Sequence, residues 1–163
     1  MATVQLGSIS TGTLREIDLL PAFAEELRRL DPTSKLVAEY DALPNDWELD
    51  WQPGVDGQAD VDYMVNEMQD ALTELAPPHM YFGSIEGDGA DFGFWPALDT
   101  LVDCERVQER VFPNGEVEYV DLDCNVYIHV NDHGNITVSK TEAVADGTGD
   151  YRLEPGQLLW DAV

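Results

Sequence analysis

The apolar residues in the first half of the chain recur with the spacing of α-helices. They predict helices over about residues 18–30, 35–43 and 61–75. The third is the most regular of these helices, and its apolar side consists of Val61, Met64, Val65, Met68, Leu72 and Leu75. Asp60 can cap this helix at its start, and Pro77 and Pro78 prevent it from continuing.

The segment between the second and third predicted helices has no helical spacing. In residues 44–59, Trp47, Leu49 and Trp51 alternate with Glu48 and Asp50. Alternation of apolar and polar residues is typical of a strand with one exposed side. We therefore expect a short edge strand or an ordered loop at this point.

Short strands separated by turns are predicted at the start of the chain and throughout its second half. The expected strands are residues 4–9, 79–85, 92–95, 106–112, 116–121, 125–130, 136–140 and part of 151–163, which Pro155 and Gly156 interrupt. Residues 113–115 and 131–135 contain the Asn and Gly residues that hairpin turns require. The three remaining segments are residues 86–91 as a turn, 96–103 as a short helix and 141–150 as a loop.

The order of these elements predicts the fold class. Helices come first and strands follow, which indicates an α+β fold with the N-terminal helices packed on one face of a mostly antiparallel β-sheet. The chain has 163 residues, no internal repeat and no long linker, so we expect one domain over residues 1–163. Apolar residues make up 44% of it, which is ordinary for a folded protein.

The net charge of the chain is large and unevenly distributed along the sequence. The chain has 33 acidic and 8 basic residues, which gives a net charge of -25. Residues 36–105 contain 17 of the acids and not one Lys or Arg. Such a surface repels nucleic acid and anionic membranes and attracts basic protein surfaces. The predicted partner is therefore the basic surface of a nucleic-acid-binding protein, without direct contact with nucleic acid or membrane.

The third predicted helix arranges carboxylates in a row. Asp60, Glu67, Asp70 and Glu74 lie within about 80° of one another around the helix axis and extend over about 21 Å. The row is either the solvated side of a helix in an acidic protein or an imitation of the phosphates that DNA-binding proteins recognise. Further residues predicted to contact the partner are Asp46, Glu48, Asp50, Glu86, Asp88 and Asp91, with Trp47 and Trp51 as aromatic anchors.

Other chemistry has weaker support in the sequence. The acids in residues 86–91 and 146–150 resemble calcium ligands in type, but their spacing is not that of an EF-hand loop. His129, His133 and Asp132 are expected to be strand and turn residues rather than a metal or acid–base site. Motifs of nucleophilic enzymes, phosphate-binding loops and zinc spacings are not found, and Cys104 and Cys124 are expected to be free thiols. We expect a binding protein that is not an enzyme and uses no metal and no cofactor.

The sequence also predicts where the protein resides. No segment approaches the roughly 20 apolar residues of a membrane span. The first residues lack the basic start and apolar block of a signal peptide. A cytoplasmic location is therefore expected.

Two segments resemble small uncharacterised acidic proteins carried by plasmids and phages. They are residues 80–96, MYFGSIEGDGADFGFWP, and residues 131–135, NDHGN. The resemblance implies a setting in mobile genetic elements, where small acidic proteins that imitate DNA disarm DNA-binding defence enzymes. It implies no activity and no site residues.

The leading hypothesis is therefore an acidic DNA mimic that inhibits a nucleic-acid-binding protein, for example as an anti-restriction or anti-CRISPR factor. One alternative is a salt-adapted acidic protein of a halophile. Another is a small calcium-binding or enzymatic domain that uses the turn at residues 86–91.

Overall fold

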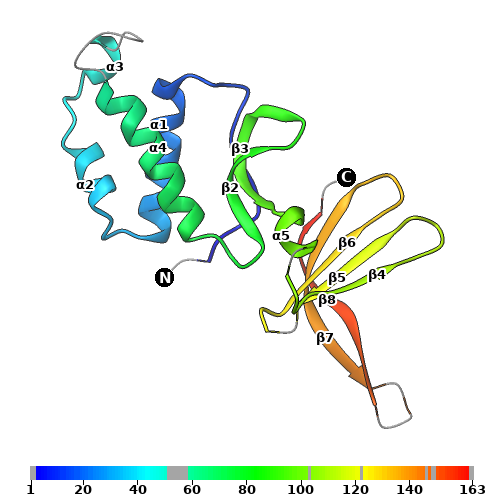
Figure 1. The fold of residues 1–163 in the computed structure, drawn as a ribbon. Coiled ribbons are helices and arrows are strands. Elements are labelled where there is room, and N and C mark those ends of the chain that lie inside the picture. Colours follow the sequence, from blue (N-terminus) through cyan, green and yellow to red (C-terminus); the bar gives the residue numbers. More distant parts are fainter. Residues whose placement is uncertain are drawn as a thin grey trace. The chain divides into compact units, whose positions relative to one another are not determined.

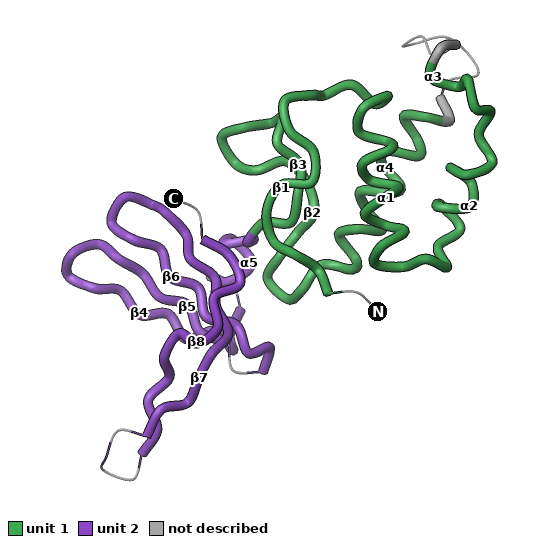
Figure 2. The backbone as a smooth tube through the Cα atoms, turned by 180° about the vertical axis from the view of Figure 1, so that it is seen from behind, with its two compact units in different colours: residues 1–95 green, residues 96–163 purple. Residues whose placement is uncertain are grey.

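The chain forms two compact units, residues 1–95 and residues 96–163 (Figure 2). The computed structural model describes residues 3–50, 59–102, 104–121, 123–145, 147 and 150–161. Helices precede most of the strands, and the strands form two antiparallel sheets. This confirms the predicted α+β class, with two sheets where one was expected. The expectation of one domain over residues 1–163 stays a prediction.

The first unit packs helices on one side of a three-stranded sheet (Figure 1). Its elements are β1 (Gly7–Thr11), α1 (Glu16–Leu30), α2 (Lys35–Asp41), α3 (Trp47–Asp50), α4 (Ala59–Glu74), β2 (Met80–Ile85) and β3 (Asp88–Pro96). The strand order is β1-β3-β2, so the last strand lies between the other two. The three helices predicted from the sequence are thus confirmed as α1, α2 and α4, with ends that differ from prediction by two residues or fewer.

Aromatic rings from α1 and the sheet form the centre of this unit. The ring of Phe23 lies 4.9 Å from that of Phe82 and 5.5 Å from that of Phe92, measured between centroids. Phe82 and Phe94 are also in contact, with centroids 4.9 Å apart. Met68 of α4 is fully buried in the same core. The apolar side of α4 therefore faces α1 and the sheet, and its opposite side faces away from them.

Two predictions in this unit are wrong. Trp47–Asp50 is one turn of helix, not an edge strand or a loop, and the ring of Trp47 packs against Tyr40 with centroids 6.5 Å apart. The turn predicted at residues 86–91 is shorter than expected. Gly87, with φ 93°, completes the reversal, and the backbone from Asp88 onwards belongs to β3, where Asp91 is the partner of Thr11 in β1.

The second unit is a meander of five strands with a short helix. Its elements are α5 (Leu98–Val102), β4 (Gln108–Val111), β5 (Val117–Asp121), β6 (Val126–Val130), β7 (Ile136–Ala145) and β8 (Tyr151–Asp161), with the strands in sequential order. Both predicted hairpins form. They are closed by hydrogen bonds from Phe112 N to Glu116 O, 2.9 Å, and from Asn131 N to Asn135 O, 3.0 Å.

The loop predicted over residues 141–150 is wrong for its first half. β7 continues to Ala145, and its end pairs with Tyr151 at the start of β8. Pro155 does not end β8, because the strand lies at the edge of the sheet and the register shifts between Val138 and Thr141. Pairing across the sheet therefore extends both strands beyond what local sequence signals.

None of the helices in the described part of the chain is both long enough and apolar enough to cross a membrane.

Candidate protein-interaction surface

The outward side of α4 carries a row of carboxylates. Asp70 and Glu74 are exposed and Glu67 is half-buried. Within the described residues, none of these three acids forms an ion pair with Lys or Arg. Asp60 lies in the first turn of α4, not before it as a cap, and its side chain is outside the described part of the structure. Of the four predicted residues in the row, the structure therefore describes the side chains of Glu67, Asp70 and Glu74.

Tyr63 connects the acids of α4 with those of α2. Its side chain is 58% exposed and lies one turn before Glu67. The pKa of Tyr63 is raised, first by the negative charge of Glu67, then by loss of hydration and a hydrogen bond to Glu67, and finally by the charge of Glu39. Because Glu39 belongs to α2, carboxylates of two helices act on one phenol. We call Glu39, Tyr63, Glu67, Asp70 and Glu74 the acidic surface.

Acids of α2 and α3 lie around the aromatic pair of Tyr40 and Trp47. The pKa of Tyr40 is raised by burial and then by the charge of Glu48. Asp46 and Glu48 are exposed, as predicted for contact residues, whereas Trp47 is half-buried and packs against the core. Trp51 and the side chain of Asp50 lie outside the described residues. The role of Trp47 as an anchor stays a prediction.

The arginines of the first unit are neutralised by neighbouring acids. Arg28 pairs with Glu25 at 2.6 Å and with Asp41 at 2.5 Å. Arg29 pairs with Glu26 at 2.6 Å, and Arg15 lies 3.8 Å from Asp18. These guanidinium groups therefore do little to offset the charge of the acidic surface.

The acids at the β2–β3 hairpin occupy a different place. Glu86 and Asp88 are exposed, and Oδ1 of Asp88 accepts the backbone N–H of Ala90 at 3.0 Å. Asp91 is half-buried, and its Oδ2 accepts the hydroxyl of Ser8 at 3.0 Å. Side chains alternate along β3, and Phe92 faces the helices, so Asp91 lies on the opposite face of the sheet. The structure thus separates Asp91 from the α4 row.

The histidines of the second unit do not form one site. His129 lies 3.5 Å from Glu116, whereas His133, which is 81% exposed, lies 3.7 Å from Asp132. The two imidazoles thus contact different carboxylates. A cavity beside Arg110, Glu118 and Tyr127 has a volume of about 70 Å³, well below the roughly 300–1,000 Å³ of small-molecule pockets.

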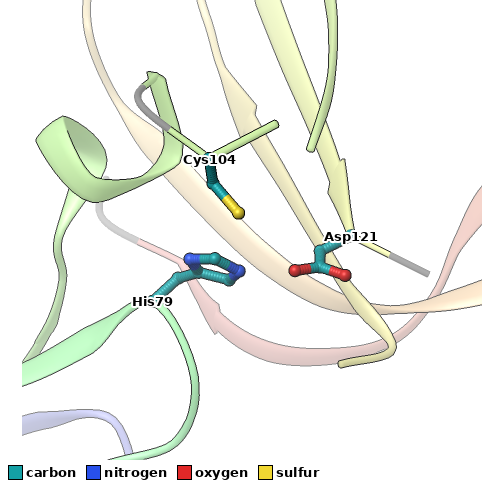
Figure 3. Close-up of side chains that lie close together, drawn as sticks. All are labelled: His79, Cys104 and Asp121. Carbon is teal, nitrogen blue, oxygen red and sulfur yellow. The ribbon is translucent and has the colours of Figure 1, made fainter. Parts of the chain in front are cut away.

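Sequence reasoning missed the approach of Cys104 to Asp121 in the second unit. Cys104 and Asp121 point toward one another (Figure 3), and the sulfur lies within 4.8 Å of a carboxylate oxygen. The thiol of Cys124 hydrogen-bonds to the same carboxylate. Cys104 and Asp121 lie 17 positions apart in the chain, so no local spacing could have indicated their contact.

Comparison of the chain with models of known protein families, with curated proteins and with solved structures found no match.

Proposed function

We propose that this protein is an acidic DNA mimic, not an enzyme, that binds a nucleic-acid-binding protein and blocks it. A phage or plasmid factor directed against a restriction or CRISPR-type defence system would fit this description. The single observation that supports the proposal most is the outward row of Glu67, Asp70 and Glu74 on α4, which has no ion-pair partner among the described residues. Glu39 adds a carboxylate from a second helix.

The physical argument rests on the rigidity and sign of this row. A groove that binds DNA contacts phosphates mainly through Lys and Arg. Carboxylates on a packed helix offer such a groove a row of anions at intervals of about 4.5–6 Å along the axis. α4 is anchored by Met68 and Leu72, which are fully buried. Its backbone is therefore already ordered before binding, and association does not have to offset the entropy cost of ordering it. The surrounding negative charge accelerates the encounter with a basic partner.

The test compares two variants with the same net charge. In the first, Asp60, Glu67, Asp70 and Glu74 are replaced by Lys. In the matched control, four acids of the second unit are replaced by Lys: Glu109, Asp132, Glu142 and Asp150, all exposed. Wild type and both variants are used at low salt to capture proteins from a host lysate, with elution by a salt gradient.

Wild type and the control should capture the same DNA-binding protein, and the α4 variant should not. Added duplex DNA should displace the captured protein, and the purified partner should lose DNA binding when the mimic is added. If the α4 variant captures the partner as well as wild type does, or if duplex DNA does not compete, the proposal is wrong. Circular dichroism verifies that each variant is folded.

One observation favours a second candidate, a salt-adapted acidic protein. Residues 96–163 carry fourteen acids against four bases, so acidity is not confined to the unit with the acidic surface. Only two of the basic residues in the whole chain are Lys. In this case the protein should depend on high salt for folding. Charge reversal on α4 should then affect binding no more than charge reversal in the second unit.

A further inference from the structure

The paired ends of β7 and β8 extend beyond the other strands of the second unit (Figure 1). The pairing of β6 with β7 ends at Val126 and Lys140, whereas β7 and β8 stay paired through residues 141–145 and 151–155. We call these two segments the ribbon. A ribbon of two strands is at best marginally stable in water by itself. A further strand along its open side would therefore stabilise it.

The backbone of residues 151–155 presents hydrogen-bonding groups at the open edge of β8. Thr141 N donates to Asn125 O at 3.3 Å, so the N–H of Thr141 points away from β8. Thr141 is the partner of Pro155, and successive residues of an antiparallel ladder direct their N–H and C=O groups to opposite sides. The backbone groups of Tyr151, Leu153 and Pro155 therefore point away from β7. Pro155, which has no N–H, is tolerated at this position because β8 is an edge strand.

The side chains of the same segment form a symmetric pattern around Leu153. Tyr151, Leu153 and Pro155 lie on one face of β8, and Tyr151 is 73% exposed. Arg152 and Glu154 lie on the other face and form an ion pair with each other. The segment thus has an apolar face, and its other face carries one charge of each sign at equal distances from Leu153.

This pattern matches a second copy of itself. When two copies of one strand pair antiparallel about a two-fold axis, one residue lies opposite itself. With Leu153 at this position, Arg152 of each copy lies opposite Glu154 of the other, and Tyr151 lies opposite Pro155. Opposite charges across two strands are favourable, and like charges are unfavourable. The amide of Leu153 then donates to the carbonyl oxygen of Leu153 in the other copy, and that of Tyr151 to the carbonyl oxygen of Pro155.

We propose that residues 151–155 are a dimerisation edge, through which two copies of this protein pair their β8 strands antiparallel and join their sheets. The mixed charge of the segment favours a second copy over a basic peptide, because such a peptide would place a positive charge opposite Arg152. The net charge of -25 repels the two copies, so the dimer should become tighter as salt screens this repulsion. The proposal is independent of the function proposed for the acidic surface.

The first test uses the full-length wild type at 1 M KCl, where repulsion is screened beyond about 3 Å. Sedimentation equilibrium should show a monomer–dimer equilibrium whose dissociation constant falls as KCl is raised from 50 mM to 1 M. Hydrogen exchange followed by NMR should become slower for the amides of Tyr151 and Leu153 as the dimer forms. The amides of Arg152 and Glu154, which point toward β7, are the internal controls and should change much less.

Two charge variants identify the contact between the copies. Arg152→Glu has acids at both positions, and Glu154→Arg has bases at both. Each variant should dimerise more weakly by about tenfold or more, because two favourable pairs become two repulsive ones. An equimolar mixture should form a heterodimer with the affinity of wild type, and this mixed pair has the same total charge as two wild-type copies. Both variants lack the ion pair within β8, so recovery on mixing is a property of the contact between copies.

Exposed apolar residues at the two edges of the sheet provide a matched pair of variants. Val111 of β4 is 65% exposed and lies on the other edge strand. Tyr151→Ser should weaken the dimer by about tenfold, because it removes the ring that packs on Pro155 of the other copy. Val111→Ser should leave the dissociation constant unchanged. Circular dichroism verifies that all variants are folded.

Four results would overturn the dimerisation edge. One is a wild type that stays monomeric at 1 M KCl at every protein concentration. Another is a mixture of the two folded charge variants that forms no heterodimer. A third is a Val111→Ser variant that dimerises as weakly as Tyr151→Ser does. The last is protection of the amides of Tyr151 and Leu153 by a Lys-rich peptide but not by a higher protein concentration, which would assign this edge to a basic peptide.

Discussion

Two adjacent glutamates of α1 have the same charge in different surroundings. Glu26 is 7% exposed, and Arg29 donates to it from Nε at 2.8 Å and from a terminal nitrogen at 2.6 Å. Arg29 also donates to the carbonyl oxygen of Thr3 at 2.9 Å, which ties the start of the chain to the helix. The side chain of Glu25 is 76% exposed and pairs with Arg28.

We predict that Glu26→Gln lowers the free energy of unfolding by about 1–3 kcal/mol, because it replaces a buried acceptor pair with a neutral amide. Glu25→Gln is the matched control and should leave stability unchanged, because exposed ion pairs contribute little. Urea denaturation of the two variants and wild type measures the difference. Equal stability of the two variants would show that the pairing of Glu26 with Arg29 does not stabilise α1.

At the scale of elements, the pairing of β1 with β3 depends on a glycine. Gly93 lies opposite Ser8, and a Cβ atom at position 93 would be 2.1 Å from the carbonyl oxygen of Gly7. The contact is with backbone, so no side-chain rotation can relieve it. Gly89 belongs to the same strand, but a Cβ atom there would meet nothing within 4 Å.

Gly93→Ala should therefore destabilise the protein by about 1–3 kcal/mol through overpacking, and Gly89→Ala should have little effect. Thermal unfolding followed by circular dichroism compares the two variants. Because β1 lies at the edge of its sheet, hydrogen exchange in Gly93→Ala should increase first for the amides of β1. If both variants melt at the same temperature, the close approach of the two strands does not restrict position 93.

The elements also differ in how well local sequence predicts them. α4 was predicted almost completely because one side of it is uninterrupted core, from Val61 to Leu72. α3 was not, because the alternation of Trp47, Leu49 and Trp51 imitates a strand. In the structure, Trp47 N donates to Pro44 O at 3.1 Å and the ring of Trp47 contacts Tyr40. The second half of β7 has no apolar alternation, and its strand conformation comes from pairing with β8.

Repulsion between its many carboxylates is the dominant electrostatic property of the whole protein. Residues 1–95 have nineteen acids and four bases, and residues 96–163 have fourteen and four. Repulsion between exposed charges extends over about 10 Å at 0.1 M salt but only about 3 Å at 1 M. Salt should therefore stabilise the compact state, and the size of this effect separates the two candidate functions.

For a DNA mimic, we predict a cooperatively folded protein at 50 mM KCl. Its melting temperature should rise by about 2–4 °C at 1 M KCl, equivalent to roughly 1 kcal/mol. The variant with four Lys in the second unit has eight fewer net negative charges and should respond less to salt. Loss of the cooperative transition below 100 mM KCl would instead support the salt-adapted protein.

Local sequence patterns were enough to predict the α+β class, three of the helices, both hairpins of the second unit and the acidity. These features depend on periodicity, turn residues and composition, which neighbouring positions encode. Helix geometry also placed Glu67, Asp70 and Glu74 on one side. Only the tertiary structure brought Glu39 to the same surface, moved Asp91 to the other face of its sheet and placed Cys104 beside Asp121. Those relations join residues far apart in the chain, and they follow from packing and strand register, which local patterns do not specify.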